Sequence, residues 1–254
     1  MVERYASREE YKNLFTTLKR KETAEKIHVK GKTLDIATGP SYFAIQVAKT
    51  HTETTITGID IFEGSIKTAR KNIKKEGLQD RIKIIQMDAT DLQFMDESFD
   101  IAINYLGLED IHMTRGRKGV VQAFREIHRV LKPGGSFYFV VIPVGRLDTW
   151  AQRLEAEVFN WICGAKWLHH NEYLQILEET GFKLVGSHDF YTGLKLEVEQ
   201  AKEEISYACR NVEKNYGINT PSFDETWCKF RERIEKHGMG HYSKTCLIKS
   251  RKKG

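Results

Sequence analysis

Small and acidic residues recur directly after four apolar segments of this sequence. The first group is the loop 35–41, which begins with Asp35, and Asp60, Asp88 and Asn104 follow at the ends of the next three segments. The carboxyl ends of parallel strands meet at one edge of an open α/β sheet, and ligands bind at that edge. We therefore expect these groups to surround a single ligand.

Each of these groups suits a nucleotide-like ligand. The small residues of the loop 35–41 let the backbone approach the ligand, and the helix that follows offers free N–H groups to a carboxylate. Asp60 can accept hydrogen bonds from both hydroxyls of a ribose, and Asp88 can accept one from an adenine amino group. Taken singly, Asp60 and Asp88 can equally cap a helix or a turn, and Asn104 can be a satisfied turn residue. It is their recurrence at consecutive strand ends that indicates a cofactor site.

Strand-like and helix-like segments alternate along most of the chain, a pattern typical of an α/β sheet. The strand-like segments are rich in Ile, Val and Phe and are bounded by Gly, Asp or Pro: Thr33–Ala37, Thr54–Asp60, Ile82–Asp88, Phe99–Tyr105, Ser136–Pro143 and Lys183–Phe190. The helices expected between them are Tyr42–Thr50, Glu63–Glu76, Gly119–Leu131 and Asn171–Thr180.

Helical segments are also expected near both ends of the sequence. Residues 7–10, Ser-Arg-Glu-Glu, have the pattern of a capping box and predict the start of a helix. Apolar residues spaced three or four apart predict a second helix over 194–216 and a third after Pro221. We expect this helical hairpin, inserted before a last strand at Tyr242–Lys249, to lie on the sheet as a flap.

These segments predict a single domain in five parts. They are an N-terminal helical cap (1–30), a cofactor-binding core (31–145), an aromatic acceptor-side region with strand six (146–193), the helical flap (194–240) and the last strand with a basic tail (241–254).

The segment from about Lys32 to Pro143 resembles the class I S-adenosylmethionine-dependent methyltransferase family, with a methyltransferase-11/25-like core. The resemblance rests on Leu34-Asp35-Ile36-Ala37-Thr38-Gly39, Gly58-Ile59-Asp60-Ile61, Gln86-Met87-Asp88-Ala89, Phe99-Asp100-Ile101-Ala102-Ile103-Asn104 and the stretch 125–136. It implies a Rossmann-like sheet of seven mostly parallel strands, with an antiparallel last strand and helices on both faces. The first loop departs from the family, which usually has glycine where this chain has Ala37 and often again at Ser41.

The resemblance implies that S-adenosyl-L-methionine is the cofactor and S-adenosyl-L-homocysteine the product. Asp35 and Gly39 would line the methionine end, Ile61 would pack on adenine, and Asn104 would lie where methyl donor and acceptor meet. The full set of expected cofactor contacts is Asp35, Ala37, Thr38, Gly39, Asp60, Ile61, Asp88, Ala89 and Asn104.

The sequence does not name a general base, and methyl transfer does not always need one because the cofactor supplies the electrophile. The candidates for a catalytic role are Tyr105 and Glu109, after the fourth strand. Glu109 and its neighbour Asp110 could take a proton or recognise a cationic acceptor, and the alternative is that they cap the next helix.

Two other features could contact the acceptor. The basic segment 115–118 could hold an anionic substrate or an RNA phosphate, or it could be a solvated helix start. An aromatic set could supply the walls of an acceptor pocket, although core packing is the commoner role of such residues. Its members are Trp150, Phe159, Trp161 and Trp167.

The composition is that of many classes of protein and indicates less about function than the motifs do. The 254 residues carry a net charge of +5 and four isolated cysteines, and they show no secretory signal and no apolar run long enough for a membrane. We expect a cytoplasmic protein with no metal site and no membrane contact, and the oligomeric state stays open. The leading hypothesis is methyl transfer to a small molecule. The alternatives are an RNA or protein side-chain methyltransferase and a non-catalytic cofactor-binding scaffold.

Overall fold

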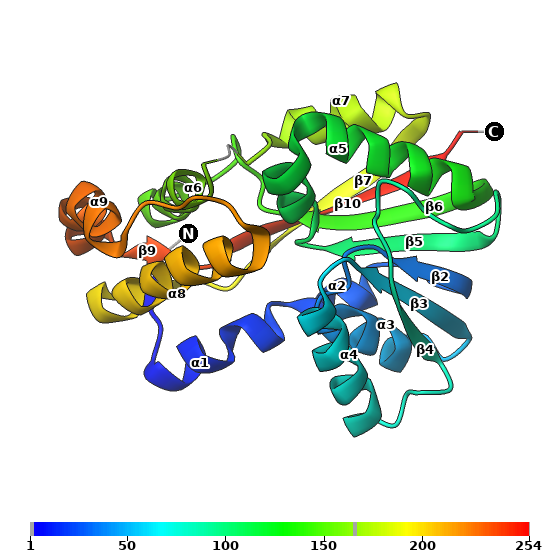
Figure 1. The fold of residues 1–254 in the computed structure, drawn as a ribbon, viewed down its shortest axis with the longest axis horizontal. Coiled ribbons are helices and arrows are strands. Elements are labelled where there is room, and N and C mark those ends of the chain that lie inside the picture. The colour runs from blue at the N-terminus through cyan, green and yellow to red at the C-terminus, as the bar shows by residue number, and fades with distance from the viewer. Residues whose placement is uncertain (1–2, 165–166, 254) are drawn as a thin grey trace.

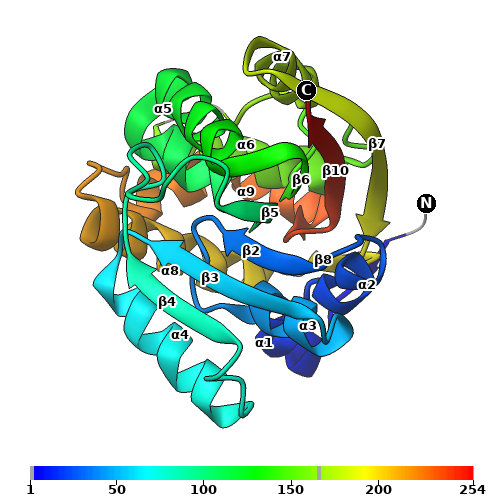
Figure 2. The same ribbon diagram turned by 90° about the vertical axis from the view of Figure 1, so that its right-hand side faces the viewer.

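The computed structural model describes residues 3–164 and 167–253, which are organised around a seven-stranded sheet (Figures 1 and 2). The strand order is β4-β3-β2-β5-β6-β10-β7. The strands are β2 (Gly31–Asp35), β3 (Thr54–Asp60), β4 (Ile82–Gln86), β5 (Phe99–Tyr105), β6 (Leu131–Val141), β7 (Phe182–Tyr191) and β10 (Lys244–Lys252). Strand β10 runs antiparallel to both of its neighbours, and the pairs from β4 to β6 are parallel. The predicted Rossmann-like fold with a reversed last strand is confirmed.

Alternate residues of the central strands pack against helices on opposite faces of the sheet. Ala102 of β5 joins the core beside α5 (Leu108–Val130) and α7 (His170–Glu179), whereas Ile101 and Ile103 join the core beside α3 (Tyr42–Thr50) and α4 (Glu63–Lys75). Figure 2 shows these two helix pairs on either side of the strands. Because both faces are covered, apolar residues of β5 occupy both faces of the strand. The predicted bounds of β3 and β5 match the structure.

Helix α5 begins at Leu108, well before the predicted start at Gly119. A kink at Gly116, with φ 63° and ψ −172°, interrupts it without ending it. Glycine adopts this left-handed conformation without the steric cost that a Cβ atom brings. The first helical stretch of α5 therefore follows β5 almost directly, and the basic segment 115–118 lies at the kink between two helical stretches. The second stretch covers the helix predicted over Gly119–Leu131 except for its last residue.

The C-terminal helices form a second packed group beside the carboxyl ends of the parallel strands (Figure 1). Helices α6 (Trp150–Cys163), α8 (Val198–Tyr216) and α9 (Phe223–His237) share an apolar core. The sequence did not predict α6, whose N-cap Thr149 accepts a hydrogen bond from the backbone N–H of Gln152. The prediction of a helix over 194–216 was wrong for the first residues, which form strand β8 (Leu194–Leu196). This strand pairs with β1 (Arg4–Tyr5) and β9 (Met239–Gly240).

The N-terminal helices complete this end of the molecule. Helix α1 (Arg8–Thr17) starts with the predicted capping box, in which Ser7 Oγ accepts the N–H of Glu10 at 3.2 Å and the Glu10 carboxylate accepts the N–H of Ser7 at 2.9 Å. The short α2 (Arg20–Glu25) follows and packs beside α3. Within the described ranges, the helices are all too short or too polar to cross a bilayer.

Candidate functional site

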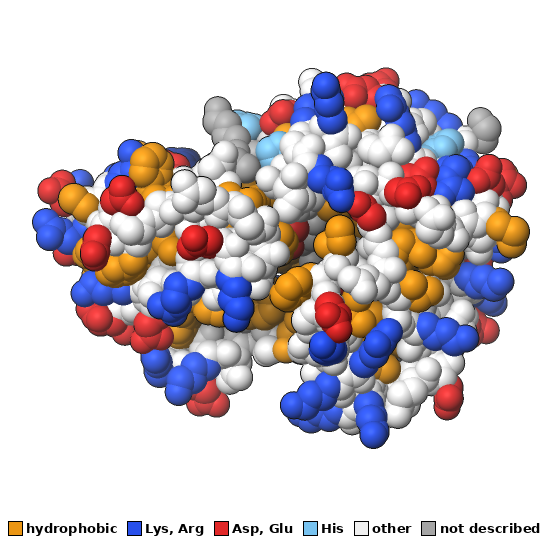
Figure 3. All heavy atoms as spheres, viewed as in Figure 1, with side chains coloured by type: hydrophobic (Ala, Val, Ile, Leu, Met, Phe, Trp, Pro, Cys, Tyr) orange, Lys and Arg blue, Asp and Glu red, His pale blue; other side chains and the backbone are white. Residues whose placement is uncertain are grey.

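A cavity of about 760 Å³ opens at the carboxyl ends of β2, β3 and β5. Its size is typical of a small-molecule or cofactor site. All of the predicted cofactor contacts except Asn104 line this cavity, which we call the cofactor cavity. In Figure 3 the surface is hollowed between the helical group and the sheet, and hydrophobic side chains lie around the hollow.

The loop 35–41 forms one wall of the cofactor cavity and is tightly turned. Thr38 Oγ1 donates a hydrogen bond to Asp35 Oδ2 at 2.5 Å and lies 3.0 Å from Ser41 Oγ. Ala37, Gly39 and Ser41 all have positive φ, at 49°, 53° and 61°. Left-handed backbone is costly for residues with a Cβ atom, and such strain concentrates at functional sites. Ala37 thus adopts the conformation for which the family's usual glycine is suited.

Asp35 is held in this loop by burial as well as by hydrogen bonding. The residue is 2% exposed, and removal of the carboxyl from water raises its pKa to about 7. The hydrogen bond from Thr38 opposes part of that rise. Asp35 is therefore poised to accept a proton or a hydrogen bond near neutral pH.

Asp60 ties β3 to the loop 35–41. Its Oδ2 atom accepts the backbone N–H of Gly39 at 2.8 Å, and its Oδ1 atom accepts that of Phe62 at 2.9 Å. Burial raises the pKa of Asp60 against these hydrogen bonds. A carboxylate offers about four lone pairs, so two acceptor positions remain for a ligand.

Asp88 is already engaged within the protein. Its Oδ1 atom accepts the backbone N–H of Thr90 at 2.9 Å and the Thr90 hydroxyl at 2.8 Å, while its Oδ2 atom forms an ion pair with Arg115. Arg117 pairs with Glu179 at 2.9 Å. An adenine amino group at Asp88 would have to share the carboxylate with Arg115. Both arginines of the basic segment are engaged on the protein's own carboxylates.

Asn104 and Glu109 do not line the cofactor cavity. Asn104 is fully buried, and its Nδ2 atom donates to the Ile36 carbonyl at 2.7 Å, which joins β5 to the first loop. Glu109 Oε1 accepts the backbone N–H of Ile142 at 3.2 Å, and burial raises the pKa of Glu109 to about 7. Neither residue is among the lining residues, so their predicted contacts with cofactor and acceptor lack geometric support.

Tyr105 does line the cofactor cavity, but its hydroxyl donates to the carbonyl of Leu18. Burial raises the pKa of Tyr105 to about 12. A phenol that is protonated and committed to a backbone carbonyl is a poor general base at neutral pH. Tyr105 thus forms part of the cavity wall, and its catalytic role stays a prediction.

Of the acidic pair after β5, it is Asp110 and not Glu109 that lines the cofactor cavity. Its side chain is accessible to solvent within the cavity, yet the surrounding protein raises its pKa to about 6. Tyr216 of α8 lies beside it and opposes part of this rise. Asp110 is therefore the acidic group of this loop that can meet a ligand.

Several lining residues come from segments that no sequence motif connects with the site. Phe15 and Arg20 belong to the N-terminal helices, Tyr207 and Tyr216 belong to α8, and Tyr242 precedes β10. The aromatic residues expected to wall the acceptor pocket are outside this cavity. Trp150 instead stacks on His237, and Phe159 stacks on Trp167, with ring centroids 5.4 and 5.7 Å apart.

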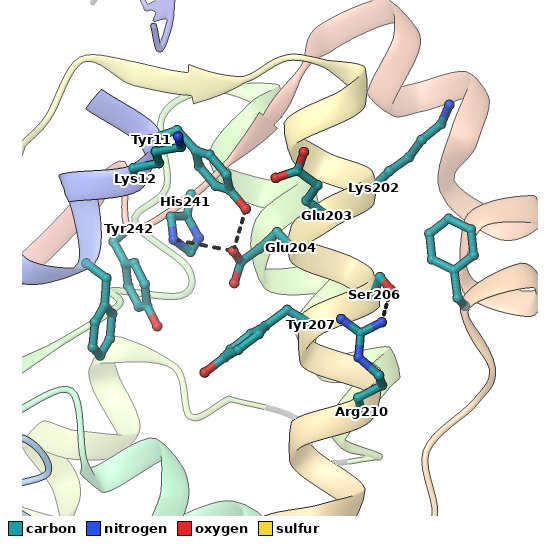
Figure 4. A pocket seen from close by; sticks show the side chains of 12 residues that line it. Tyr11, Lys12, Lys202, Glu203, Glu204, Ser206, Tyr207, Arg210, His241 and Tyr242 are labelled. Atoms are coloured by element: carbon teal, nitrogen blue, oxygen red, sulfur yellow. Dashed lines mark hydrogen bonds and ion pairs between the residues drawn. The ribbon is translucent and has the colours of Figure 1, made fainter. Parts of the chain in front are cut away.

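A second cavity of about 710 Å³ adjoins the first (Figure 4). Phe15, Tyr207 and Tyr242 line both cavities, so these three aromatic residues form the boundary between them. The second cavity, which we call the distal cavity, lies between α1 and α8 and also contacts Glu204 and His241. Together the two cavities provide room for two ligands side by side.

A buried carboxyl, Glu155 of α6, fixes the backbone at Tyr242. It is 2% exposed and accepts the N–H of Tyr242, which has a left-handed φ of 50°. Burial raises the pKa of Glu155 to about 8. The folded protein therefore keeps a proton that the unfolded chain releases near pH 4, and the free energy of unfolding should fall as the pH rises from about 4 to about 8.

We expect Glu155→Gln, which cannot ionise, to reduce this pH dependence by up to about 1.4 kcal/mol per pH unit. Denaturant unfolding at pH 5.5 and pH 8 measures it. Glu157→Gln is the matched control, because Glu157 lies on the same helix but is exposed and paired with Arg233 at 2.5 Å. If the free energy of unfolding depends on pH equally in the wild type and in Glu155→Gln, the folded protein does not hold this proton on Glu155.

Comparison with known proteins gives a consistent result. Residues 34–139 match the methyltransferase domain family. The chain is 34% identical over 102 residues to demethylmenaquinone methyltransferase of Bacteroides fragilis, covering 40% of this chain and 39% of that protein. The chain thus spans well under two thirds of the length of such curated relatives.

Solved structures share the fold. The [4+2]-cyclase SpnF aligns with a TM-score of 0.63 at 22% identity, over 92% of this chain and 80% of that one. A SAM-dependent methyltransferase of Methanosarcina mazei aligns with a TM-score of 0.57 at 17% identity, over 90% of this chain and 95% of that one. Because one fold serves several reactions, the reaction of this chain has to be argued from its site.

Proposed function

We propose that the chain, whose residues 34–139 match the methyltransferase domain family, transfers a methyl group from S-adenosyl-L-methionine to a small-molecule acceptor. The observation that carries the proposal is the pair of adjoining cavities that share Phe15, Tyr207 and Tyr242. A methyl donor in one cavity and an acceptor in the other would meet at this boundary.

The residues of the cofactor cavity fit the proposed cofactor. Asp60 keeps two acceptor positions that suit the ribose hydroxyls, and the loop 35–41 presents its backbone to the cavity. When bound, the cofactor supplies a methyl group activated by its sulfonium. The protein then has to orient the acceptor and exclude water, and Asp110, with a pKa of about 6, can hold a proton at the cavity wall.

Arg20 has no carboxylate partner within salt-bridge distance among the described residues, although it is only 5% exposed. Its guanidinium lies over the rings of Phe15, Tyr42 and Tyr105, at 5.3, 5.5 and 4.7 Å, and donates to the Phe15 carbonyl. Burial lowers the pKa of Arg20, but an arginine remains charged. A buried charge is costly unless it is paired, so we assign Arg20 to the carboxylate of the cofactor's methionine portion.

We expect Arg20→Met to weaken binding of S-adenosyl-L-homocysteine about 10- to 100-fold, since a hydrogen bond to a charged group contributes roughly 1.5–3 kcal/mol. Calorimetry with 5′-methylthioadenosine, which lacks the amino-acid portion, is the internal control. The affinity for 5′-methylthioadenosine should be the same in the wild type and in Arg20→Met. An equal loss for both ligands would mean that Arg20 supports the fold and does not bind the carboxylate.

The surroundings of the basic segment favour a small acceptor over RNA. Arg115 and Arg117, the residues that would contact phosphates, are held by Asp88 and Glu179. Aromatic side chains from α1, α8 and the segment just before β10 line the distal cavity, which suits a compact ligand. Demethylmenaquinone methyltransferase, by its name, also acts on a small molecule.

Two measurements test the proposal. Calorimetry should detect binding of S-adenosyl-L-methionine and S-adenosyl-L-homocysteine, and failure to bind either would exclude the methyltransferase assignment. In a cell extract supplied with methyl-labelled cofactor, the purified protein should transfer label to acid-soluble metabolites. Label in precipitated RNA or protein would instead support a macromolecular acceptor.

A further inference from the structure

Glu204 is a carboxylate of the distal cavity that lacks a permanently charged partner. Its side chain is 15% exposed, and its contacts are the Tyr11 hydroxyl at 3.3 Å and the His241 Nε2 atom at 3.9 Å (Figure 4). Burial lowers the pKa of His241, so the imidazole is largely neutral at physiological pH. Neither contact therefore neutralises the carboxylate.

Three other charged residues of the distal cavity are engaged elsewhere, whereas Lys12 of α1, which also lines it, forms no salt bridge with Glu204 among the described residues. Glu203 forms a salt bridge with Arg8 at 2.8 Å. Lys202 pairs with Glu199 at 2.7 Å, and Figure 4 shows it pointing away from Glu204. Arg210 donates to Ser206 at 2.6 Å. Over residues 3–164 and 167–253, no lysine or arginine forms a salt bridge with Glu204. A carboxylate this enclosed is costly without a counter-ion.

His241 lies beside Glu204 and also lines the distal cavity, but it does not supply the missing counter-ion. The residue is 5% exposed, and its Nδ1 atom has no hydrogen-bond partner among the described residues. The Glu204 carboxylate beside Nε2 favours the tautomer with its proton on Nε2, which leaves the Nδ1 lone pair as an acceptor. The site thus presents a carboxylate whose neighbours are neutral, and an ammonium group, which has only donors and carries the opposite charge, suits it.

The boundary between the cavities suits the same chemistry. Phe15 and Tyr242 lie with ring centroids 6.2 Å apart, and Tyr207 completes the boundary. Aromatic faces attract cations, and Asp110 places a further carboxylate on the cofactor side. We propose that the distal cavity binds the methyl acceptor through a cationic amine, with Glu204 as its counter-ion. The role as acceptor rests on the proposed function, but selective amine binding does not.

The test compares three probes of nearly equal shape: phenethylamine, 2-phenylethanol and 3-phenylpropionate. Their affinities for the full chain are measured by calorimetry and ligand-detected NMR, with and without S-adenosyl-L-homocysteine. We expect the amine to bind at least about 10-fold more tightly than the alcohol and the acid, because a hydrogen bond to a charged partner is among the stronger ones.

Variants of the two adjacent glutamates locate the effect. Glu204→Gln should remove the preference for the amine while leaving the affinity for S-adenosyl-L-homocysteine unchanged. Glu203→Gln is the matched control and should keep the preference, because Glu203 is exposed and paired with Arg8. The proposal is overturned if the amine does not bind, if the acid or alcohol binds as well, or if both variants lose the preference equally. Amine selectivity without cofactor binding would instead overturn the methyltransferase assignment alone.

Discussion

Replacing Asp60 with Ala is expected to weaken binding of S-adenosyl-L-methionine by about two orders of magnitude or more. The variant would lose two hydrogen bonds from the ribose hydroxyls to a carboxylate, each contributing roughly 1.5–3 kcal/mol, and about 1.4 kcal/mol corresponds to a tenfold change in affinity. Asp60 also accepts the backbone N–H groups of Gly39 and Phe62, so the loop 35–41 would lose its anchor to β3. Calorimetry measures the affinity.

Two further variants separate binding from folding in this experiment. Asp60→Asn keeps the shape and one acceptor oxygen, and we expect an intermediate loss of affinity. Asp91→Ala is the control, because Asp91 is exposed and does not line the cofactor cavity. Unchanged affinity in Asp60→Ala, with thermal unfolding like that of wild type, would show that the ribose is bound elsewhere.

Gly107→Ala is expected to destabilise the protein by about 3 kcal/mol, the upper part of the range for overpacking a tight site. A Cβ atom at Gly107 would lie 2.7 Å from Ala37 Cβ, 2.8 Å from Asn104 Nδ2 and 3.1 Å from the Ala37 carbonyl. These atoms belong to the first loop and to a buried, hydrogen-bonded side chain, so they cannot move aside cheaply. Cofactor binding should fall with stability because the strain enters the loop 35–41.

Gly186→Ala is the matched control for this substitution. Gly186 lies in β7, and a Cβ atom added there meets no heavy atom within 4 Å. Its effect should stay within about 0.5 kcal/mol, as for most surface substitutions. Denaturant unfolding of both variants gives the comparison. If Gly107→Ala is as stable as Gly186→Ala, the approach of the two loops is looser than the structure describes.

The sheet and its cofactor loops could be predicted from the sequence because their signals are local. Strands β3 and β5 are rich in β-branched and apolar residues, and Asp60 ends one of them. Strand β8 could not be predicted in this way. Its three residues form a strand only because β1 and β9, from distant parts of the chain, provide partners. The same residues continue an amphipathic helical pattern, so local periodicity extended the helix too far.

The acidic pair after β5 shows why the site was predicted less well than the fold. Glu109 and Asp110 are adjacent, and neighbouring residues on a helix point in directions about 100° apart. Which one faces the cofactor cavity depends on the phase of α5, which in turn depends on where the helix begins. With a predicted start at Gly119, that phase was not available. Arg20 and Tyr207 raise a related difficulty, since only the tertiary fold brings them to the strand ends.

The boundary between the two cavities also has a consequence for the order in which the protein becomes functional. Phe15 and Tyr242 belong to opposite ends of the sequence, and the left-handed turn at Tyr242 is held by Glu155 from the middle. Contacts between segments so far apart form only after the intervening chain has been ordered. During synthesis, the core that carries Asp35 and Asp60 can fold while the last strand is still within the ribosome. The wall that separates donor from acceptor is therefore completed last.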